Sequence, residues 1–500
     1  MARSFLSLTI ALAIAAVILG AGAPSAMAQP TISTTTATTP KPKEYPEVQA
    51  ALKALNERKL DEALDDLRKA ARMYSELPSE YIMMYRIMVQ ANQPNAARFW
   101  LEKAVTETPS DPEPWVILGS IALQDSRMAE AEIDFAKAEQ LLGTYSNADR
   151  KGVIEQQTLS GMAQVAERRE RWPEAQKRLE KFLEKSPEDL VALQRLARSM
   201  FWQKKVEEAY TVLKKAKDID KKNAEKNKAR EQLLPAEATM AQYYDAYERG
   251  AKYKKSANAE TWYKYALRQA PNDLSLRAVV AVWALENGDI ALAKDQAKEA
   301  LRIEAADAAL PQADRKYSGS TAGRMLSGYV ALWEKQWADA EGYFEKVILE
   351  APNDFAARNN IALALVEQDD PIKKRRAVEY AEGNYKNNKD NADAASTLSW
   401  VYFRTGQAFD QAGLAMDQVL KATNGNVSNP DTATYLAHIL YHNGRKYEAK
   451  QILETIIGSG RPFSMQPEAK ELYEKVKDEK APAAAPAAGP TAPATTPKTP

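Results

Sequence analysis

Two histidines stand one helical turn apart, at His438 and His442. A pair with this spacing lies on one face of a helix and can chelate a transition metal. No Glu lies between the two, so the zinc-peptidase motif is missing. The chain has no third histidine and no cysteine to complete a site. We therefore expect a solvated surface pair and no bound metal.

Other reactive groups lack the partner residues that catalysis needs. No Gly-rich phosphate loop follows a strand pattern, and no G-x-S-x-G motif is present. Carboxylate pairs such as Asp65–Asp66 and Asp369–Asp370 lie in charged, solvated contexts. The lack of cysteine also excludes disulfides and a cysteine nucleophile. These absences predict a protein that is not an enzyme and uses no cofactor.

Charge gives little support to nucleic-acid binding. Lys and Arg total 68, and so do Asp and Glu, which leaves no net charge. One lysine-rich stretch, Lys214 to Arg230, is interrupted by Asp218, Asp220 and Glu225. It is interpreted either as a solvated helix face or as a site for an acidic partner or membrane surface.

A repeat of about 34 residues runs through the chain and must position whatever site exists. Its mark is an alanine followed four residues later by a large apolar side chain. The anchoring alanines are Ala63, Ala97, Ala131, Ala175, Ala209, Ala259, Ala293, Ala340, Ala377, Ala412 and Ala449. Longer intervals indicate insertions between units, and one of them, Ala224–Thr239, is expected to be a helical extension.

Companion residues keep the same register. A proline that can stop a helix follows four anchors, at Pro109, Pro187, Pro271 and Pro352. A small residue precedes most anchors and allows two helices to approach closely. These small residues are Gly119, Ala163, Ala197, Ala281, Gly328, Ala362, Ser399 and Ala437. Glycines at Gly288, Gly406 and Gly444 stand where a first helix must turn into a second.

These residues resemble the tetratricopeptide repeat, most closely where Trp115-x2-Leu118-Gly119 is followed by Ala131-x3-Phe135. The resemblance implies an all-α, right-handed solenoid of about eleven antiparallel helix pairs. First helices would line its concave face, and the usual role would be to bind peptides or protein partners. No stretch between Glu44 and Lys480 shows the alternation of a strand.

The two ends of the chain predict export and flexible tethers. Arg3, the apolar run Phe5–Leu19 and Ala26-Met27-Ala28 fit a cleaved signal peptide, and an uncleaved anchor is the alternative. The predicted segments are a signal peptide at 1–28, a Thr/Pro-rich linker at 29–43, the solenoid at 44–465, a capping helix at 466–480 and a disordered Ala/Pro-rich tail at 481–500. We expect an exported, bacterial-type member of the family in the periplasm or outside the cell, with no membrane span left after cleavage.

The concave face is the predicted binding site. In the resembled family, positions at fixed offsets from each small packing residue face the groove, and aromatic and arginine side chains there are typical of binding hot spots. One continuous partner surface is predicted from Tyr329, Trp333, Trp400, Phe403, Arg404 and Tyr441. The predicted function is a non-enzymatic scaffold of the cell envelope that binds a peptide or protein partner. The alternative is a ligand- or glycan-binding protein that stacks sugar rings on the same aromatics. The sequence specifies neither the partner nor the oligomeric state.

Overall fold

The structure is a computed structural model that describes residues 45–227, 229–249, 253–317 and 319–480. Within these ranges the regular structure is α-helix, apart from a short 3₁₀ helix at Gln312–Asp314, and no strand occurs. The predicted all-α solenoid is confirmed. The predicted signal peptide, Thr/Pro-rich linker and C-terminal tail lie outside the described residues.

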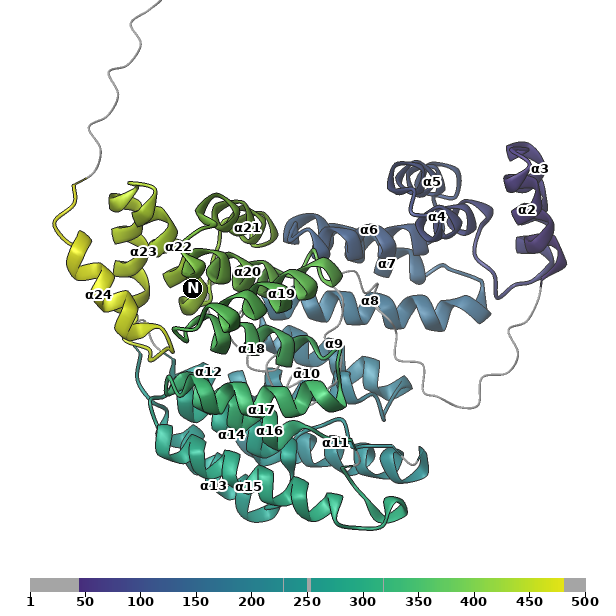
Figure 1. The fold of residues 1–500 in the computed structure, drawn as a ribbon. Helices are drawn as coiled ribbons and strands as arrows, with labels where there is room; N and C mark the ends of the chain where they lie inside the picture. The colour runs from purple at the N-terminus through teal and green to yellow at the C-terminus, as the bar shows by residue number, and fades with distance from the viewer. Residues whose placement is uncertain (1–44, 228, 250–252, 318, 481–500) are drawn as a thin grey trace, which may run out of the picture. The chain divides into compact units, whose positions relative to one another are not determined.

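The helices follow one another with short connections (Figure 1). In chain order they are α2 (Pro46–Asn56), α3 (Leu60–Met73), α4 (Glu80–Gln90), α5 (Pro94–Glu107), α6 (Glu113–Gln124), α7 (Met128–Leu142), α8 (Ala148–Arg168), α9 (Trp172–Lys185), α10 (Leu190–Trp202), α11 (Val206–Asn227), α12 (Ala236–Glu248), α13 (Ala257–Gln269), α14 (Leu274–Glu286), α15 (Ile290–Ala308), α16 (Ala322–Trp333), α17 (Trp337–Glu350), α18 (Phe355–Val366), α19 (Pro371–Asn387), α20 (Ala392–Thr405), α21 (Phe409–Ala422), α22 (Pro430–His442), α23 (Lys446–Gly458) and α24 (Gln466–Val476).

The predicted repeat register is present in these helices. Each anchoring alanine lies in the second helix of a pair, from α3 to α23, and none is more than 3% exposed. The two helices of a pair pack on each other in the pairs from α2 and α3 to α10 and α11, and again from α14 and α15 to α22 and α23. After the last pair, α24 packs on α23 and buries Ala469, Leu472 and Val476. It lies within the range predicted for a capping helix.

The small residues of the first helices make room for aromatic side chains of the second helices. Phe135 on α7 is 1% exposed. A Cβ added to Gly119 on α6 would lie 3.0 Å from its ring, and one added to Gly161 on α8 would lie 2.3 Å from it. The ring therefore fills space that only glycine leaves free on both neighbouring helices.

Left-handed backbone joins the first helix of a pair to the second. Gly288, Gly406 and Gly444 adopt positive φ there, as predicted. The same conformation occurs at residues that carry no turn signal, among them Glu170 (φ 57°) and Lys204 (φ 65°). An L-residue with a Cβ pays a steric cost in this region that glycine avoids.

Replacing Glu170 by glycine is therefore expected to stabilise the fold by about 0.5–1 kcal/mol. The exposed Glu180, inside α9, is the matched control. There glycine should destabilise the helix by about 1 kcal/mol, because it adds backbone freedom to the unfolded chain without relieving strain. Thermal melts should show a higher melting temperature for Glu170→Gly and a lower one for Glu180→Gly. A lower melting temperature for Glu170→Gly would contradict the strain argument.

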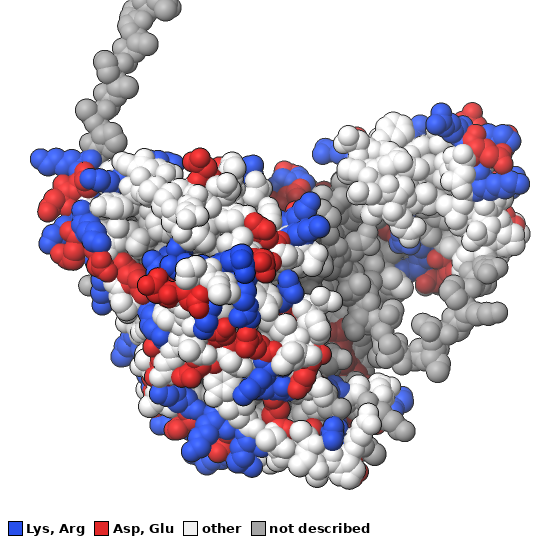
Figure 2. All heavy atoms as spheres, viewed as in Figure 1, with Lys and Arg blue, Asp and Glu red and all other residues white. Residues whose placement is uncertain are grey.

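The lysine-rich stretch ends in a loop instead of the predicted helical extension. The helix α11 stops at Asn227, and residues 229–235 are not helical. The buried Asp220 carboxylate accepts hydrogen bonds from the backbone N–H groups of Gln232 (2.9 Å) and Leu233 (2.8 Å), which turns the chain back. Lys217 pairs with Glu231 at 2.7 Å. Lys217 and Asp220 of this stretch therefore stabilise the turn between α11 and α12. On the face drawn in Figure 2, basic and acidic side chains are interspersed.

The described residues form two compact units, and the division falls between Thr239 and Met240, inside α12. The N-terminal unit holds α2 to α11. In the C-terminal unit, each first helix from α14 to α22 contacts the next first helix as well as its own partner. This row of first helices carries all six predicted binding residues.

Candidate functional site

A hollow of about 70 Å³ opens among the first helices of the C-terminal unit. Four first helices, α16, α18, α20 and α22, contribute side chains, and the segment before α24 closes one side. The lining residues are Tyr329, Leu332, Trp333, Trp337, Asn360, Leu363, Glu367, Trp400, Asp431, Tyr435, Ser464 and Met465. Aromatic rings dominate this set, with an amide and two carboxylates among them.

Three of the six predicted site residues line the hollow. Tyr329 and Trp333, from the C-terminal half of α16, are partly exposed there. Trp400 from α20 also lines it but is only 3% exposed. The expectation that Trp400 points away from the packed interior is therefore wrong. Whether these residues bind a partner remains a prediction.

Trp400 is buried because a neighbouring helix covers it. Its ring stacks on Tyr435 of α22, with 4.4 Å between the ring centroids and 14° between the planes. Its indole Nε1 donates a hydrogen bond to Glu367 Oε1 at 2.9 Å. These contacts tie α18, α20 and α22 together, so Trp400 supports the floor of the hollow.

Arg404 and Phe403 flank that floor without lining the hollow. The Arg404 guanidinium lies 5.6 Å from the Trp400 ring centroid and pairs with Glu367 at 2.8 Å. Phe403 stacks on Trp400 with 5.5 Å between centroids. Tyr441 stands apart from this group, and its ring lies 5.9 Å from the Lys446 ammonium. The structure thus brings five of the six predicted residues to one region and leaves Tyr441 outside it.

The two histidines extend this aromatic packing. His442 stacks on Phe409 with 3.8 Å between centroids, and His438 meets Trp400 edge to face at 5.5 Å. Burial lowers the pKa of His438 to about 4, and its Nε2 has no hydrogen-bond partner. The expectation of a solvated pair is wrong for His438, because the side chain is enclosed by rings. No cluster of three or more metal-binding side chains occurs among the residues that the structure describes.

Sequence reasoning missed several lining residues. Leu363 and Glu367 stand one and five residues after Ala362, which are the offsets that identified Tyr329 and Trp333 from Gly328. Applying the same rule to that repeat would have found them. No comparable signal marked Ser464 and Met465, because they lie in an irregular segment outside the repeat.

Asp431 lines the hollow and has a raised pKa. It stands in the first turn of α22, and its Oδ1 accepts a hydrogen bond from the backbone N–H of Met465 at 2.8 Å. Burial raises the pKa of Asp431 to about 6, although the Met465 N–H and Lys335 act to lower it. Glu468 lies close enough to raise the pKa further.

Asp431→Asn is therefore expected to stabilise the C-terminal unit at pH 8 by about 1–2 kcal/mol. The folded-state pKa of Asp431 is raised, so its favourable contribution is complete below pH 3.8 and is lost as the pH rises through about 6. The amide oxygen keeps the acceptor for Met465 without the buried charge. Thermal melts from pH 4 to pH 8 should show the advantage of the variant shrinking to nothing at the acid end. A pH-independent difference would refute the assignment.

Comparison with known families identifies the repeat. Residues 168–233, which include the whole of α9, α10 and α11, match the family model described as tetratricopeptide repeat. The chain carries tetratricopeptide repeats. The register of buried alanines extends these repeats from α3 to α23, well beyond the matched residues. The resemblance inferred from the sequence is confirmed, and no curated protein matches the chain.

Solved structures share the architecture only loosely. Yeast Tom70 is 14% identical, with 86% of this chain and 95% of that chain covered and a TM-score of 0.35. A tetratricopeptide repeat protein from Parabacteroides merdae is 12% identical, with 65% and 99% covered and a TM-score of 0.35. Likeness at this level does not bear on function. Within the described residues, none of the helices combines the length and apolar character of a membrane span.

Proposed function

We propose that this protein is an exported interaction scaffold of the cell envelope that binds an extended segment of a partner protein. The repeat fold is typical of proteins that bind other proteins, and it supports the scaffold role. The binding site is the inner face of the C-terminal unit, which is the surface formed by the first helices α16, α18, α20 and α22 around Tyr329 and Trp333. Export rests on Arg3, the apolar run that follows it and the Ala26-Met27-Ala28 cleavage pattern.

The observation that carries the proposal is the hollow itself. Partly exposed Tyr329, Trp333 and Trp337 surround it, together with the polar side chains of Asn360 and Glu367. Rigid aromatic anchors beside a few polar groups are what partner hot spots contain. The volume of about 70 Å³ is small beside the roughly 300–1,000 Å³ of pockets that enclose whole small molecules. The hollow therefore suits one side chain of a longer ligand.

A photo-crosslinking experiment tests the location of binding. A benzophenone amino acid replaces Trp333 in one version of the full chain and Trp262 in the other. Trp262 is also partly exposed, but it lies on the second helix α13 and does not line the hollow. Irradiation in envelope extract should give a discrete adduct at position 333 and none at 262. Equal adducts at both positions, or an adduct at 262 alone, would refute the groove.

The proposed export has its own test. Cleavage after Ala28 would leave Gln29 as the first residue of the mature chain. N-terminal sequencing of protein recovered from native cell envelope should find Gln29. Recovery of the intact Met1 form from the cytoplasm would contradict export and would leave the groove assignment unaffected.

A further inference from the structure

The segment between α23 and α24 contacts the end of α14 and the start of α22, and it lines one side of the hollow. We call residues 459–465 the strap. Phe463 is 5% exposed and Met465 is 6% exposed, although neither belongs to a regular helix. Arg461 forms an ion pair with Glu286, which is 175 residues away in the chain. The side chains of Arg461, Phe463 and Met465 are therefore all engaged.

The strap makes its contacts with distant helices of the same unit. Its first residue, Ser459, accepts a hydrogen bond from the backbone N–H of Tyr253 at 3.0 Å. Pro462 lies against Gly288, where a Cβ would come within 3.4 Å of the proline ring. The Met465 N–H donates to Asp431 at 2.8 Å. The strap thus runs from the α12–α13 connection past the end of α14 to the start of α22.

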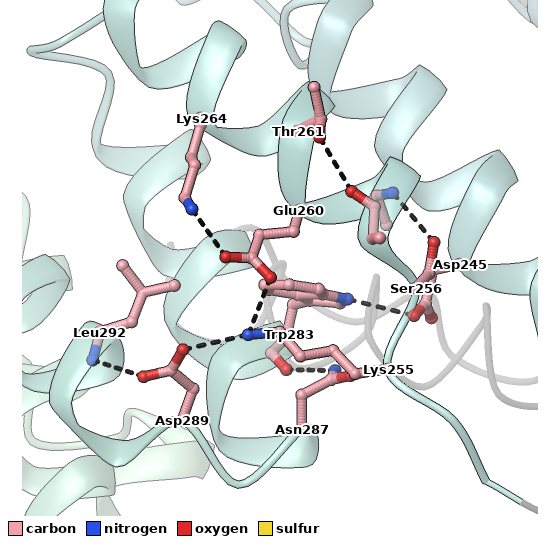
Figure 3. Close-up of polar contacts among 12 residues, drawn as sticks. Asp245, Lys255, Ser256, Glu260, Thr261, Lys264, Trp283, Asn287, Asp289 and Leu292 are labelled. Atoms are coloured by element: carbon pink, nitrogen blue, oxygen red, sulfur yellow. Dashed lines mark hydrogen bonds and ion pairs between the residues drawn. The ribbon is translucent and has the colours of Figure 1, made fainter.

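The residues that neighbour the strap's contacts at Tyr253 and Gly288 are held by contacts of their own (Figure 3). Lys255, two residues after Tyr253, bridges Glu260 at 3.0 Å and Asp289 at 3.1 Å. Trp283 Nε1 donates to Asp245 Oδ1 at 3.1 Å. None of these bonds involves the strap. These contacts can therefore persist when the strap leaves.

Capping alone does not require these contacts. The helix α24 covers α23 through Ala469, Leu472 and Val476, all of which lie beyond the strap. A connection between two packed helices needs only to join their ends. The buried Phe463 and Met465 and the Arg461–Glu286 pair are additional to capping, and they resemble the way a bound peptide fixes several of its side chains.

We propose that the strap is an intramolecular ligand of the groove and that the partner is an extended segment that takes its place. The partner segment carries a basic residue, an aromatic residue two positions on, and a methionine or similar aliphatic residue two positions further. This inference rests on the proposed function, since it specifies the ligand of the same site. The strap is tethered at both ends, so it competes with the partner segment at a high effective concentration. Only a partner segment that binds tightly enough can displace it.

The test measures binding of the strap sequence in trans. The probe is a fluorescein-labelled synthetic peptide of residues 459–468, titrated into the full chain by fluorescence anisotropy. The comparison is between the unaltered chain and an open variant, Phe463→Ser with Met465→Ser, which keeps the strap length and α24. The open variant should bind the peptide about tenfold or more tightly than the unaltered chain, because its own strap no longer competes.

A charge swap shows whether the peptide occupies the place of the strap. Glu286→Lys in the open variant should weaken the peptide about tenfold, and a peptide with Arg461→Glu should recover the loss. A folded open variant that binds neither peptide would overturn the inference. The inference would also be overturned if the affinity for the peptide did not change with Glu286→Lys in the chain and Arg461→Glu in the peptide. If a crosslink at position 333 still forms in either case, the proposed function stands and only the strap inference fails.

Hydrogen exchange in the unaltered chain decides the matter if the open variant does not fold. The amide of Met465, which donates to Asp431 at 2.8 Å, should exchange about a hundredfold or more faster than those in the middle of α22, because the strap opens without unfolding the helices. Equal rates would show that the strap leaves only when the unit unfolds, and the inference would be overturned.

Discussion

Phe135→Ala should lower the free energy of unfolding of the N-terminal unit by about 3–5 kcal/mol. The ring is fully buried and faces two glycines, Gly119 and Gly161, across α6 and α8. Neither glycine has a side chain that could move into the space, so the cavity would remain open. The free-energy cost of the lost apolar burial and the free-energy cost of the cavity therefore add together.

Ile133→Ala on the same helix is the matched control, since Ile133 is 67% exposed. Its effect should stay within about 0.5 kcal/mol. Native-state hydrogen exchange of the α7 amides measures both variants within their own unit. A loss below about 1 kcal/mol for Phe135→Ala would show that the packing of α6, α7 and α8 differs from the one described.

Trp333→Ala should weaken partner binding about thirty- to thousand-fold, a loss of about 2–4 kcal/mol. Trp333 lines the hollow and is partly exposed, so its removal takes away an anchor without opening the interior. The melting temperature should therefore hardly change. Trp262→Ala removes an indole of similar exposure from α13, outside the hollow, and should leave binding intact.

Trp400 is unsuitable for the same experiment. It is 3% exposed, stacked on Tyr435 and hydrogen-bonded to Glu367. Trp400→Ala, alone or with Phe403→Ala, should destabilise the C-terminal unit by about 3–5 kcal/mol. Loss of binding in such a variant would report unfolding. Trp333, which is partly exposed, is therefore the tryptophan to replace in a binding test, and the buried Trp400 is not.

The repeat register could be predicted because it reflects local packing. Buried alanines such as Ala131 and small residues such as Gly119 are required wherever two neighbouring helices approach closely. Turns could be predicted only where glycine occupies the left-handed position, as at Gly288. Glu170 and Lys204 adopt the same conformation because the packing of the flanking helices imposes it.

The binding face could be predicted only in part, because it depends on contacts between distant residues. The offset rule placed Tyr329 and Trp333 correctly at the hollow. It could not show that Tyr435 from the next repeat covers Trp400. It also could not show that Met465 lines one side of the hollow, since Met465 and its neighbour Lys335 are 130 residues apart in the chain.

The central claim is that the partner binds the inner face of the C-terminal unit, and oxidative footprinting of the full chain tests it most directly. Hydroxyl radicals modify accessible aromatic side chains, and each can be followed in the unaltered chain with and without the partner that the crosslink at position 333 identifies. We expect the partner to protect Trp333 and Trp337 and to leave Trp262 unprotected. Unchanged modification of Trp333 and Trp337, with protection in the N-terminal unit instead, would contradict it.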